Sequence, residues 1–530
     1  MFRKRNRFTL LGASVLTALL IAGCGANETD ASNDAGEAAA PPVAENGGEQ
    51  TVSDQPIRIA MRANPNTLDP HHTNDNPSAT INQQIFSTLV VQDEALDIVP
   101  GLAYDWTFID DLTIEFNLRD DVYFHNGEKL TAADVDFSLR RAWNSGQVSH
   151  IVGPIDPEGI EIIDDYTIRV STSEPFAPLL AHLAHVAASI LNEKAVEEAG
   201  EFVGQNPVGT GPFVFENWVQ GTSLTLSRNE NYFGETPLPS GLEFSVIVES
   251  NSRVIELETG AVDVILDVAP SDIARIVATD GLVLHQEPNL RINYVGINTE
   301  VPPFDQVEVR QALNYAIDTR SIIEFILEGV GEFATGPIGS NIPGFNADLE
   351  GYEFNPERAR ELLAEAGFPD GFETEILIDD DTVRTALATV IRNQLEEVGI
   401  VATIRSLDWA TYIDETAAGN HELFILGWTT VTADADYGLF PLFHTSTIGP
   451  GGNRSFFSYP RLDELLDQGR ASNDAAARLE IYAEAQEIIV YQAPWIFLYA
   501  DENIAATRDN VQNFILNPAG THRYARVTTN

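Results

Sequence analysis

Cys24 is the only cysteine in the chain, and the residues before it give its thiol a specific chemistry. A basic cluster at residues 3–7 precedes an uncharged apolar stretch at residues 8–23, which is the pattern of a secretory signal. The stretch is shorter than the ~20 residues of a membrane-spanning helix, and small residues before the cysteine suit a lipoprotein-processing peptidase. A lone cysteine is often a small core residue. This setting instead predicts that residues 1–23 are removed and that Cys24 carries lipid.

Residues that could perform catalysis or bind metal do not occur at the spacing which that chemistry needs. The sequence has no Gly-x-Ser-x-Gly elbow, no His-Glu-x-x-His helix and no phosphate loop ending in Gly-Lys-Ser/Thr. Several histidines lack both an i,i+4 helical partner and a cysteine partner, so we interpret them as ordinary surface or core residues: His71, His72, His125, His421 and His444. The acidic run 379–381 is interpreted as solvated charge. The sequence predicts no enzyme, no metal and no cofactor.

The net charge of the chain limits the kinds of molecule that it can bind. The chain has 80 acidic against 30 basic residues and a formal net charge of -50, which makes nucleic acid an improbable partner. The basic residues are arginines apart from Lys4, Lys129 and Lys194. We hypothesise a saline or alkaline habitat, where strong surface charge keeps an exposed protein soluble. A composition bias of the lineage explains the same counts.

The elements that follow the signal indicate a mixed α/β protein. Residues 24–55 are polar and poor in large apolar residues, so we predict a flexible tether. About 475 residues then have globular texture, which exceeds a usual single core and predicts two or three domains. Helix start and stop signals predict helices near 131–143, 355–367 and 382–398, and the glycine-rich run 206–213 is interpreted as a turn. Strands are predicted at 57–61, 112–118, 167–170, 223–227, 262–266, 292–297, 400–404 and 495–500.

Several sequence blocks in a fixed order resemble the substrate-binding proteins of peptide, dipeptide and nickel ABC importers. The blocks are Asn66-Thr67-Leu68-Asp69-Pro70, Pro100-Gly101-Leu102-Ala103, Phe124-His125-Asn126-Gly127, Val208-Gly209-Thr210-Gly211-Pro212-Phe213, Pro302-Pro303-Phe304-Asp305 and Ala316-Ile317-Asp318. The segment from Gly427-Trp428-Thr429 to Asp434-Ala435-Asp436-Tyr437, with Gly452-Asn453-Arg454-Ser455 beyond it, looks most like the glutathione or dipeptide-binding branch.

The resemblance implies a two-lobed α/β fold of the periplasmic-binding-protein type (class II, with an extra subdomain) and a ligand cleft between the lobes. Lobe I would combine residues 56–295 and 505–530, with an inserted subdomain near 93–205, and lobe II would run over 296–504. The implied function is to capture a short peptide outside the cell membrane and deliver it to ABC transporter permease subunits. The protein would be a monomer held to the outer face of the membrane by its lipid.

The resemblance also implies ligand-binding residues. In the family an aspartate shortly after the Gly-Trp pair binds the ligand ammonium, and Asp434 and Asp436 are the candidates here. Either could instead cap a following helix. If the segment is extended, both would point to the same side.

For the ligand carboxylate, dipeptide-binding relatives place an arginine ahead of the helix at 382, where this chain has the run 379–381. Arg384 and Arg454 are the nearest substitutes, because a guanidinium can grip a carboxylate with two hydrogen bonds. Trp428 and Tyr437 could wall the pocket, or belong to the core. Other ligands on the same fold, such as nickel chelates, and a peptide-sensing receptor are the alternatives.

Overall fold

The computed structural model describes residues 52–73 and 75–530. Cys24, the predicted signal and most of the predicted tether lie outside the described residues. Within the described part of the chain, no helix is both long enough and apolar enough to span a bilayer.

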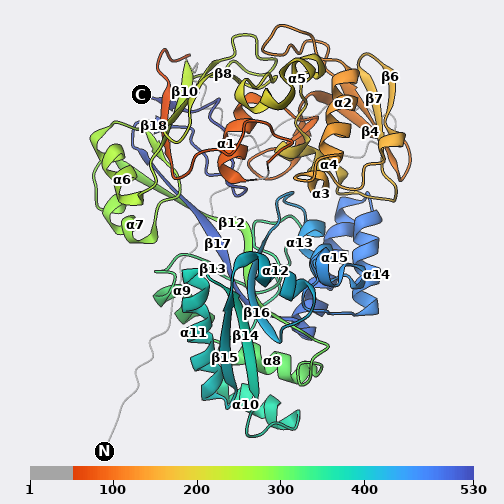
Figure 1. Ribbon diagram of the computed structural model, residues 1–530, viewed down its shortest axis with the longest axis vertical. Coiled ribbons are helices and arrows are strands. Elements are labelled where there is room, and N and C mark those ends of the chain that lie inside the picture. The colour runs from red at the N-terminus through yellow and green to blue at the C-terminus, as the bar shows by residue number, and fades with distance from the viewer. Residues whose placement is uncertain (1–51, 74) are drawn as a thin grey trace, which may run out of the picture. The chain divides into compact units, whose positions relative to one another are not determined.

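One large mixed sheet of 11 strands runs through the fold (Figure 1). Its strands follow the order β15-β14-β16-β12-β17-β11-β1-β10-β9-β8, and β13 pairs with β17. The strands are β1 (Ile57–Met61), β8 (Phe213–Val219), β9 (Ser223–Arg228), β10 (Gly241–Val246), β11 (Val264–Ile265), β12 (Leu282–Ile297), β13 (Glu332–Phe333), β14 (Glu373–Asp379), β15 (Val401–Leu407), β16 (Leu423–Thr429) and β17 (Trp495–Arg508).

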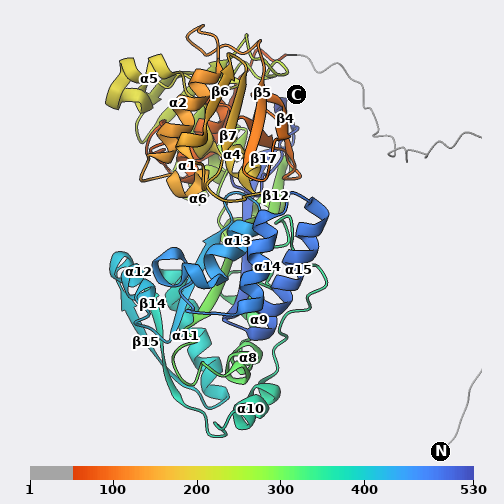
Figure 2. The same cartoon turned by 90° about the vertical axis from the view of Figure 1, so that its right-hand side faces the viewer.

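The two longest strands, β12 and β17, connect two lobes. They pair antiparallel from Leu282 opposite Arg508 to Gly296 opposite Trp495, with the register shifted between Pro288 and Ile292. Near one end β17 pairs with β11, and near the other end β12 pairs with β16. Figures 1 and 2 show the two strands running between two groups of elements. The predicted two-lobed α/β fold is therefore confirmed, while the predicted residue boundaries of the lobes stay predictions.

The N-terminal lobe adds a second sheet with the strand order β4-β5-β7-β6. Its buried residues form a separate core between Leu89 and Ile190. The further elements of this lobe are α1 (Asn76–Ile85), β2 (Val90–Gln92), β3 (Ile98–Pro100), β4 (Ala103–Phe108), β5 (Thr113–Leu118), α2 (Ala132–Trp143), α3 (Ser149–Val152), β6 (Glu161–Asp164), β7 (Thr167–Ser171), α4 (Leu179–Ala184), α5 (Glu193–Ala199), α6 (Ser250–Thr259), α7 (Pro270–Val277), β18 (Val511–Gln512) and β19 (Thr528–Thr529).

The C-terminal lobe surrounds its strands with eight helices among the described residues. A stack of Tyr294 on Trp495, with ring centroids 3.5 Å apart and planes at 3°, joins β12 to β17 inside it. The helices are α8 (Val307–Ala316), α9 (Thr319–Phe325), α10 (Pro356–Glu365), α11 (Thr382–Glu397), α12 (Trp409–Ala417), α13 (Ala435–Phe443), α14 (Pro460–Ala471) and α15 (Ala475–Gln492).

The three predicted helices are confirmed by their caps. Asp134 accepts a hydrogen bond from the Thr131 backbone N–H at 3.0 Å, which fixes the start of α2. Asn355 caps α10 through the Arg358 N–H at 3.0 Å, and Asp381 caps α11. Several strand predictions were wrong in length, since the strand predicted at 495–500 is the 14-residue β17 and the one at 400–404 is the 7-residue β15. The strand at 262–266 is only β11, and the strand at 292–297 is the last part of the 16-residue β12.

Candidate ligand-binding site

A cavity of about 420 Å³ lies where the two lobes meet. Most of its wall belongs to the N-terminal lobe and includes α1, the β2–β3 hairpin, residues 184–189 and 517–525. Leu290 of β12, together with Thr429 and Val431 at the end of β16, closes it on the side of the C-terminal lobe. A cavity of this size between two lobes has the volume and position of a small-molecule site.

The glycine-rich run at 206–213 forms part of this wall. A side chain at Gly209 would collide with the backbone carbonyl of Ile85, and one at Gly211 would come within 2.5 Å of the Gln84 carbonyl oxygen. These glycines therefore allow the run to lie directly against the end of α1, and the next residue, Pro212, lines the cavity. The run is an irregular segment with bends that leads into β8 at Phe213, and it shapes the wall.

None of the six ligand-binding residues predicted from the sequence lines this cavity. Asp434 caps α13, because its carboxylate accepts a hydrogen bond from the Asp436 N–H at 2.9 Å. The same carboxylate forms an ion pair with Arg478 of α15 at 2.6 Å. The capping alternative thus describes Asp434. The segment is not extended at this point, since α13 begins at Ala435.

Asp436 is almost completely buried in a two-point ion pair. Its two oxygens accept hydrogen bonds from Arg470 of α14 at 2.9 and 3.1 Å. The Arg470 guanidinium also stacks on Phe440, 3.3 Å from the ring centroid, and lies 5.2 Å from the Phe176 ring of the other lobe. The Arg470 backbone carbonyl accepts a hydrogen bond from the Ala177 N–H at 2.7 Å. Figure 2 shows α13 and α14 at the end of their lobe that faces the N-terminal lobe.

Trp428 and Tyr437 pack together beside the cavity. The Trp428 indole N–H donates to the Tyr437 carbonyl at 2.8 Å, and the two ring centroids are 5.4 Å apart. Tyr437 also contacts the ring of His182 in α4, with centroids 5.9 Å apart, and burial raises the pKa of its hydroxyl to about 12. Thr429, which follows Trp428 directly, lines the cavity, whereas Trp428 and Tyr437 are not among the lining residues.

Arg384 and Arg454 lie apart from that segment, each with partners of its own. Arg384 forms an ion pair with Asp379 at 2.5 Å and lies over the Trp409 ring. Asp379 is buried, so the interpretation of the run 379–381 as solvated charge is wrong for that residue. Arg454 donates to the Ile413 carbonyl at 2.8 Å and to the Thr416 hydroxyl at 2.9 Å. Burial lowers the pKa of Arg454, and only backbone and hydroxyl oxygens accept its hydrogen bonds.

Gly427, the partner of Trp428 in the sequence block, makes room for a polar group at the lobe junction. It lies opposite Asn293 in the β12–β16 pairing, and a Cβ atom on it would come within 2.5 Å of an Arg291 nitrogen. Arg291 pairs with Asp501 at 3.4 Å, and Asn293 donates to the same carboxylate at 2.9 Å. This group joins β12, β16 and β17 where the register shifts.

The cavity residues that sequence reasoning missed include Arg119, His185, Tyr232 and Arg523. They come from loops and helix ends far apart in the chain, and no local motif marks them. Among the residues that the structure describes, no cluster of three or more His, Cys, Asp or Glu side chains could hold a metal ion.

Two lobes joined by a pair of long strands, with a cavity at their junction, form an arrangement that can enclose a solute. The chain belongs to the bacterial extracellular solute-binding proteins, family 5, whose middle-region profile matches residues 97–450.

Comparisons with individual proteins agree with this class. The chain is 32% identical over 470 residues to heme-binding protein A of Haemophilus influenzae, covering 83% of this chain and 85% of the relative. It is 29% identical to the glutathione-binding protein GsiB of Salmonella typhi, covering 87% and 92%. The structure of the periplasmic binding protein DppA from Helicobacter pylori in complex with the peptide STSA is similar with a TM-score of 0.75, 28% identity and coverage of 91% and 99%. The chain is thus an extracytoplasmic binding protein and not an enzyme.

Proposed function

We propose that this protein is the substrate-binding component of an ABC importer that captures short peptides, glutathione among them, and delivers them to the membrane permease. The observation that carries the proposal is the cavity at the lobe junction, which both lobes line in a fold whose similar structures include a peptide complex. The protein acts as a monomer, and lobe I comprises 56–295 and 505–530 around lobe II at 296–504. Acyl chains on Cys24 hold it to the membrane.

A binding panel tests the ligand class. Native mass spectrometry of protein purified from its host gives the mass of any co-purified ligand. Calorimetry then compares reduced glutathione, the dipeptide Ala-Phe, hemin and nickel-histidine. Peptide binding with compaction in small-angle scattering is the expected result, because a ligand enclosed between lobes is covered by closure. Binding of hemin or the nickel chelate without any peptide would replace the peptide proposal with the other-solute alternative.

A comparison of free and N-acetylated peptides tests whether the two aspartates bind the amino group of the ligand. We propose that Asp434 or Asp436 receives it, which requires the ammonium to share a carboxylate with Arg478 or Arg470. A carboxylate has about four acceptor sites, so sharing is chemically possible. The expected result is that an Asn variant loses the preference for free over N-acetylated peptide. If both Asn variants keep wild-type affinity and preference, the amine is bound elsewhere.

The anchor has its own test, because its residues lie outside the described structure. Replacing Cys24 with Ala should release the protein into the medium or leave an unprocessed precursor. A variant that is still lipid-labelled and membrane-bound would overturn the anchor.

A further inference from the structure

The cavity has a charge opposite to that of the protein. Although 80 of 530 residues are acidic, the described residues that line the cavity include two arginines and no aspartate or glutamate. Burying a guanidinium away from its counter-ion is costly, so a positive wall in so acidic a chain needs an explanation in terms of what enters the cavity.

The first of the two arginines, Arg119, already has its counter-ion. Its guanidinium binds both carboxylate oxygens of Asp121, at 2.9 and 2.7 Å, and lies 5.3 Å from the centre of the Phe233 ring. The Asp121 carboxylate neutralises this charge at the edge of the cavity. Arg119 is therefore not the cation of this wall that lacks an ion-pair partner.

The second, Arg523, has no carboxylate within ion-pair distance among residues 52–73 and 75–530. Its Nη2 donates to the backbone carbonyl of Gln92 at 2.5 Å. With the Gln83 amide oriented so that it donates to the Thr521 hydroxyl at 3.0 Å, the Gln83 oxygen accepts from Arg523 Nε at 3.1 Å. Two neutral acceptors thus fix the guanidinium in one orientation, and neither of them carries a charge that pairs with it.

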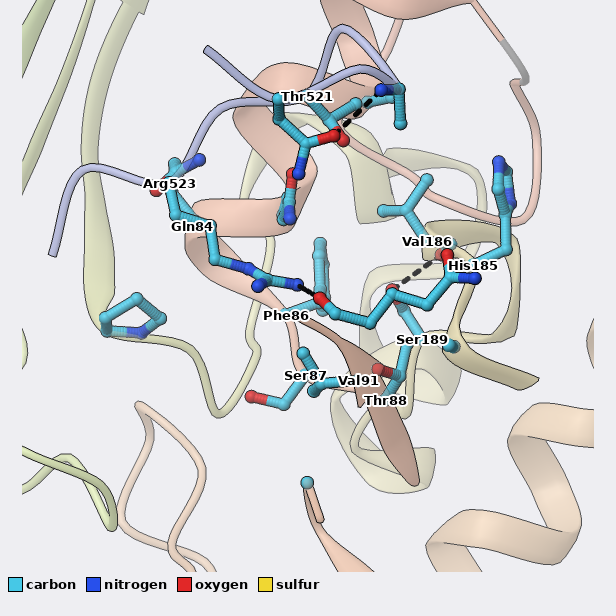
Figure 3. A pocket seen from close by; sticks show the side chains of 18 of the residues that line it. Gln84, Phe86, Ser87, Thr88, Val91, His185, Val186, Ser189, Thr521 and Arg523 are labelled. Carbon is cyan, nitrogen blue, oxygen red and sulfur yellow. Dashed lines mark hydrogen bonds between the residues drawn. The ribbon is translucent and has the colours of Figure 1, made fainter. Parts of the chain in front are cut away.

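The surroundings keep this guanidinium charged and available. Burial lowers the pKa of Arg523, and the carboxylates of Glu94 and Asp93 oppose that effect without reaching ion-pair distance. Arginine remains protonated at any physiological pH, because its ordinary pKa is far above 7. In Figure 3 the Arg523 side chain extends from the C-terminal loop towards the middle of the cavity, and His185 and Val186 lie across from it.

A neutral hydrogen-bond donor lies in the same wall of the cavity. Tyr232 lines the cavity, and its hydroxyl has no hydrogen-bond partner among the described residues. Burial raises the pKa of this hydroxyl, and the charges of Arg523 and Arg119 act in the opposite direction. A protonated phenol beside a guanidinium can donate to an anion that the guanidinium binds.

We propose that Arg523 binds a carboxylate group of the ligand, with Tyr232 as a second donor. This inference rests on the proposed function and assigns the C-terminal carboxylate of a short peptide to the N-terminal lobe. It places the carboxylate site away from Arg384, which forms an ion pair with Asp379, and from Arg454, whose hydrogen-bond acceptors are neutral oxygens.

Calorimetry with Ala-Phe and Ala-Phe amide tests the proposal on the full mature protein. Wild type should bind the free acid at least about thirtyfold more tightly than the amide, the loss expected when one partner of a buried charged pair is removed. Arg523→Gln should abolish that preference. Arg523→Lys, which keeps the charge but not the two-point geometry, should restore part of it. Arg320→Gln, which breaks an exposed ion pair with Glu353 outside the cavity, should leave the preference unchanged, and melting curves show whether each variant is folded.

The outcomes separate this proposal from the proposed function. Equal wild-type affinity for acid and amide, or an Arg523→Gln variant with the full preference, overturns the carboxylate site while peptide binding stands. If wild type binds neither peptide nor glutathione, the peptide function fails and succinate becomes the probe. Thermal stabilisation by succinate relative to NaCl of equal ionic strength, lost only in the Arg523 variant, would then support the carboxylate site. If succinate does not stabilise the wild-type protein, the carboxylate site is overturned as well.

Discussion

Replacement of Asp436 by Asn should destabilise the protein strongly, whatever the ligand is. The Asp436 side chain is 2% exposed and that of Arg470 is 18% exposed, so water screens neither charge well. Removing one partner from a buried ion pair costs about 3–5 kcal/mol, because the other charge stays behind without compensation. Here Arg470 would keep its contact with the Phe440 ring and would have Glu174 at 4.0 Å. We therefore expect about 3 kcal/mol, at the low end of that range.

Urea unfolding followed by tryptophan fluorescence and circular dichroism measures this cost as a shift of the midpoint. Arg470→Gln and the double variant complete a cycle, in which the double variant should lose less than the sum of the single losses. Glu353→Gln is the matched control. It breaks a pair with Arg320 whose side chains are 65% and 60% exposed, and should cost no more than about 1 kcal/mol. If Asp436→Asn costs no more than Glu353→Gln, the buried pair does not stabilise the fold and the reasoning is wrong.

Three further predictions concern the lobe junction, the histidines and the surface charge. Gly427→Ala should push Arg291 away from Asp501 and lower the free energy of unfolding by about 1–3 kcal/mol, and an unchanged urea midpoint would contradict this. Burial lowers to about 4 the pKa of five histidines: His71, His125, His185, His421 and His522. In the unfolded state these histidines bind protons below about pH 6.5, whereas in the folded state they do so only near pH 4. The free energy of unfolding should therefore decrease as the pH falls from about 6.5 towards 4, and equal urea midpoints at pH 7.5 and pH 5 would contradict this prediction. If the acidic composition is an adaptation to salt, stability should rise with NaCl concentration, whereas a flat response would favour a composition bias.

Local signals in the sequence predicted the elements that depend on local chemistry. Helices α2, α10 and α11 start at capping residues that the sequence displays, and the glycine-rich run at 206–213 was visible because glycine is needed where backbones meet closely. Most of β12 was missed. Its first half contains exposed and partly exposed polar residues, since it crosses between lobes instead of lying in a core, and a polar run does not resemble a strand.

The site itself could not be predicted from local patterns. Asp434 and Asp436 meet Arg478 and Arg470, which are 44 and 34 residues further along, and nothing in the sequence marks those pairs. Arg523 reaches the carbonyl of Gln92, 431 residues away. Such contacts are set by packing of whole lobes, so the sequence predicted the kind of site but neither the arginine partners of these aspartates nor the arginines in the cavity wall.

The C-terminal part of the cavity wall has a consequence for the order of events during synthesis. Residues 517–525 close a chamber whose other walls come mainly from residues 76–234, yet the whole C-terminal lobe is made between these two segments. A growing chain can complete the second lobe while the chamber in the first is still open. Residues 517–525 are therefore made after the whole C-terminal lobe, and they finish the wall of the cavity. A chain made only as far as the end of the C-terminal lobe would lack this part of the wall and would not yet enclose a ligand in the cavity.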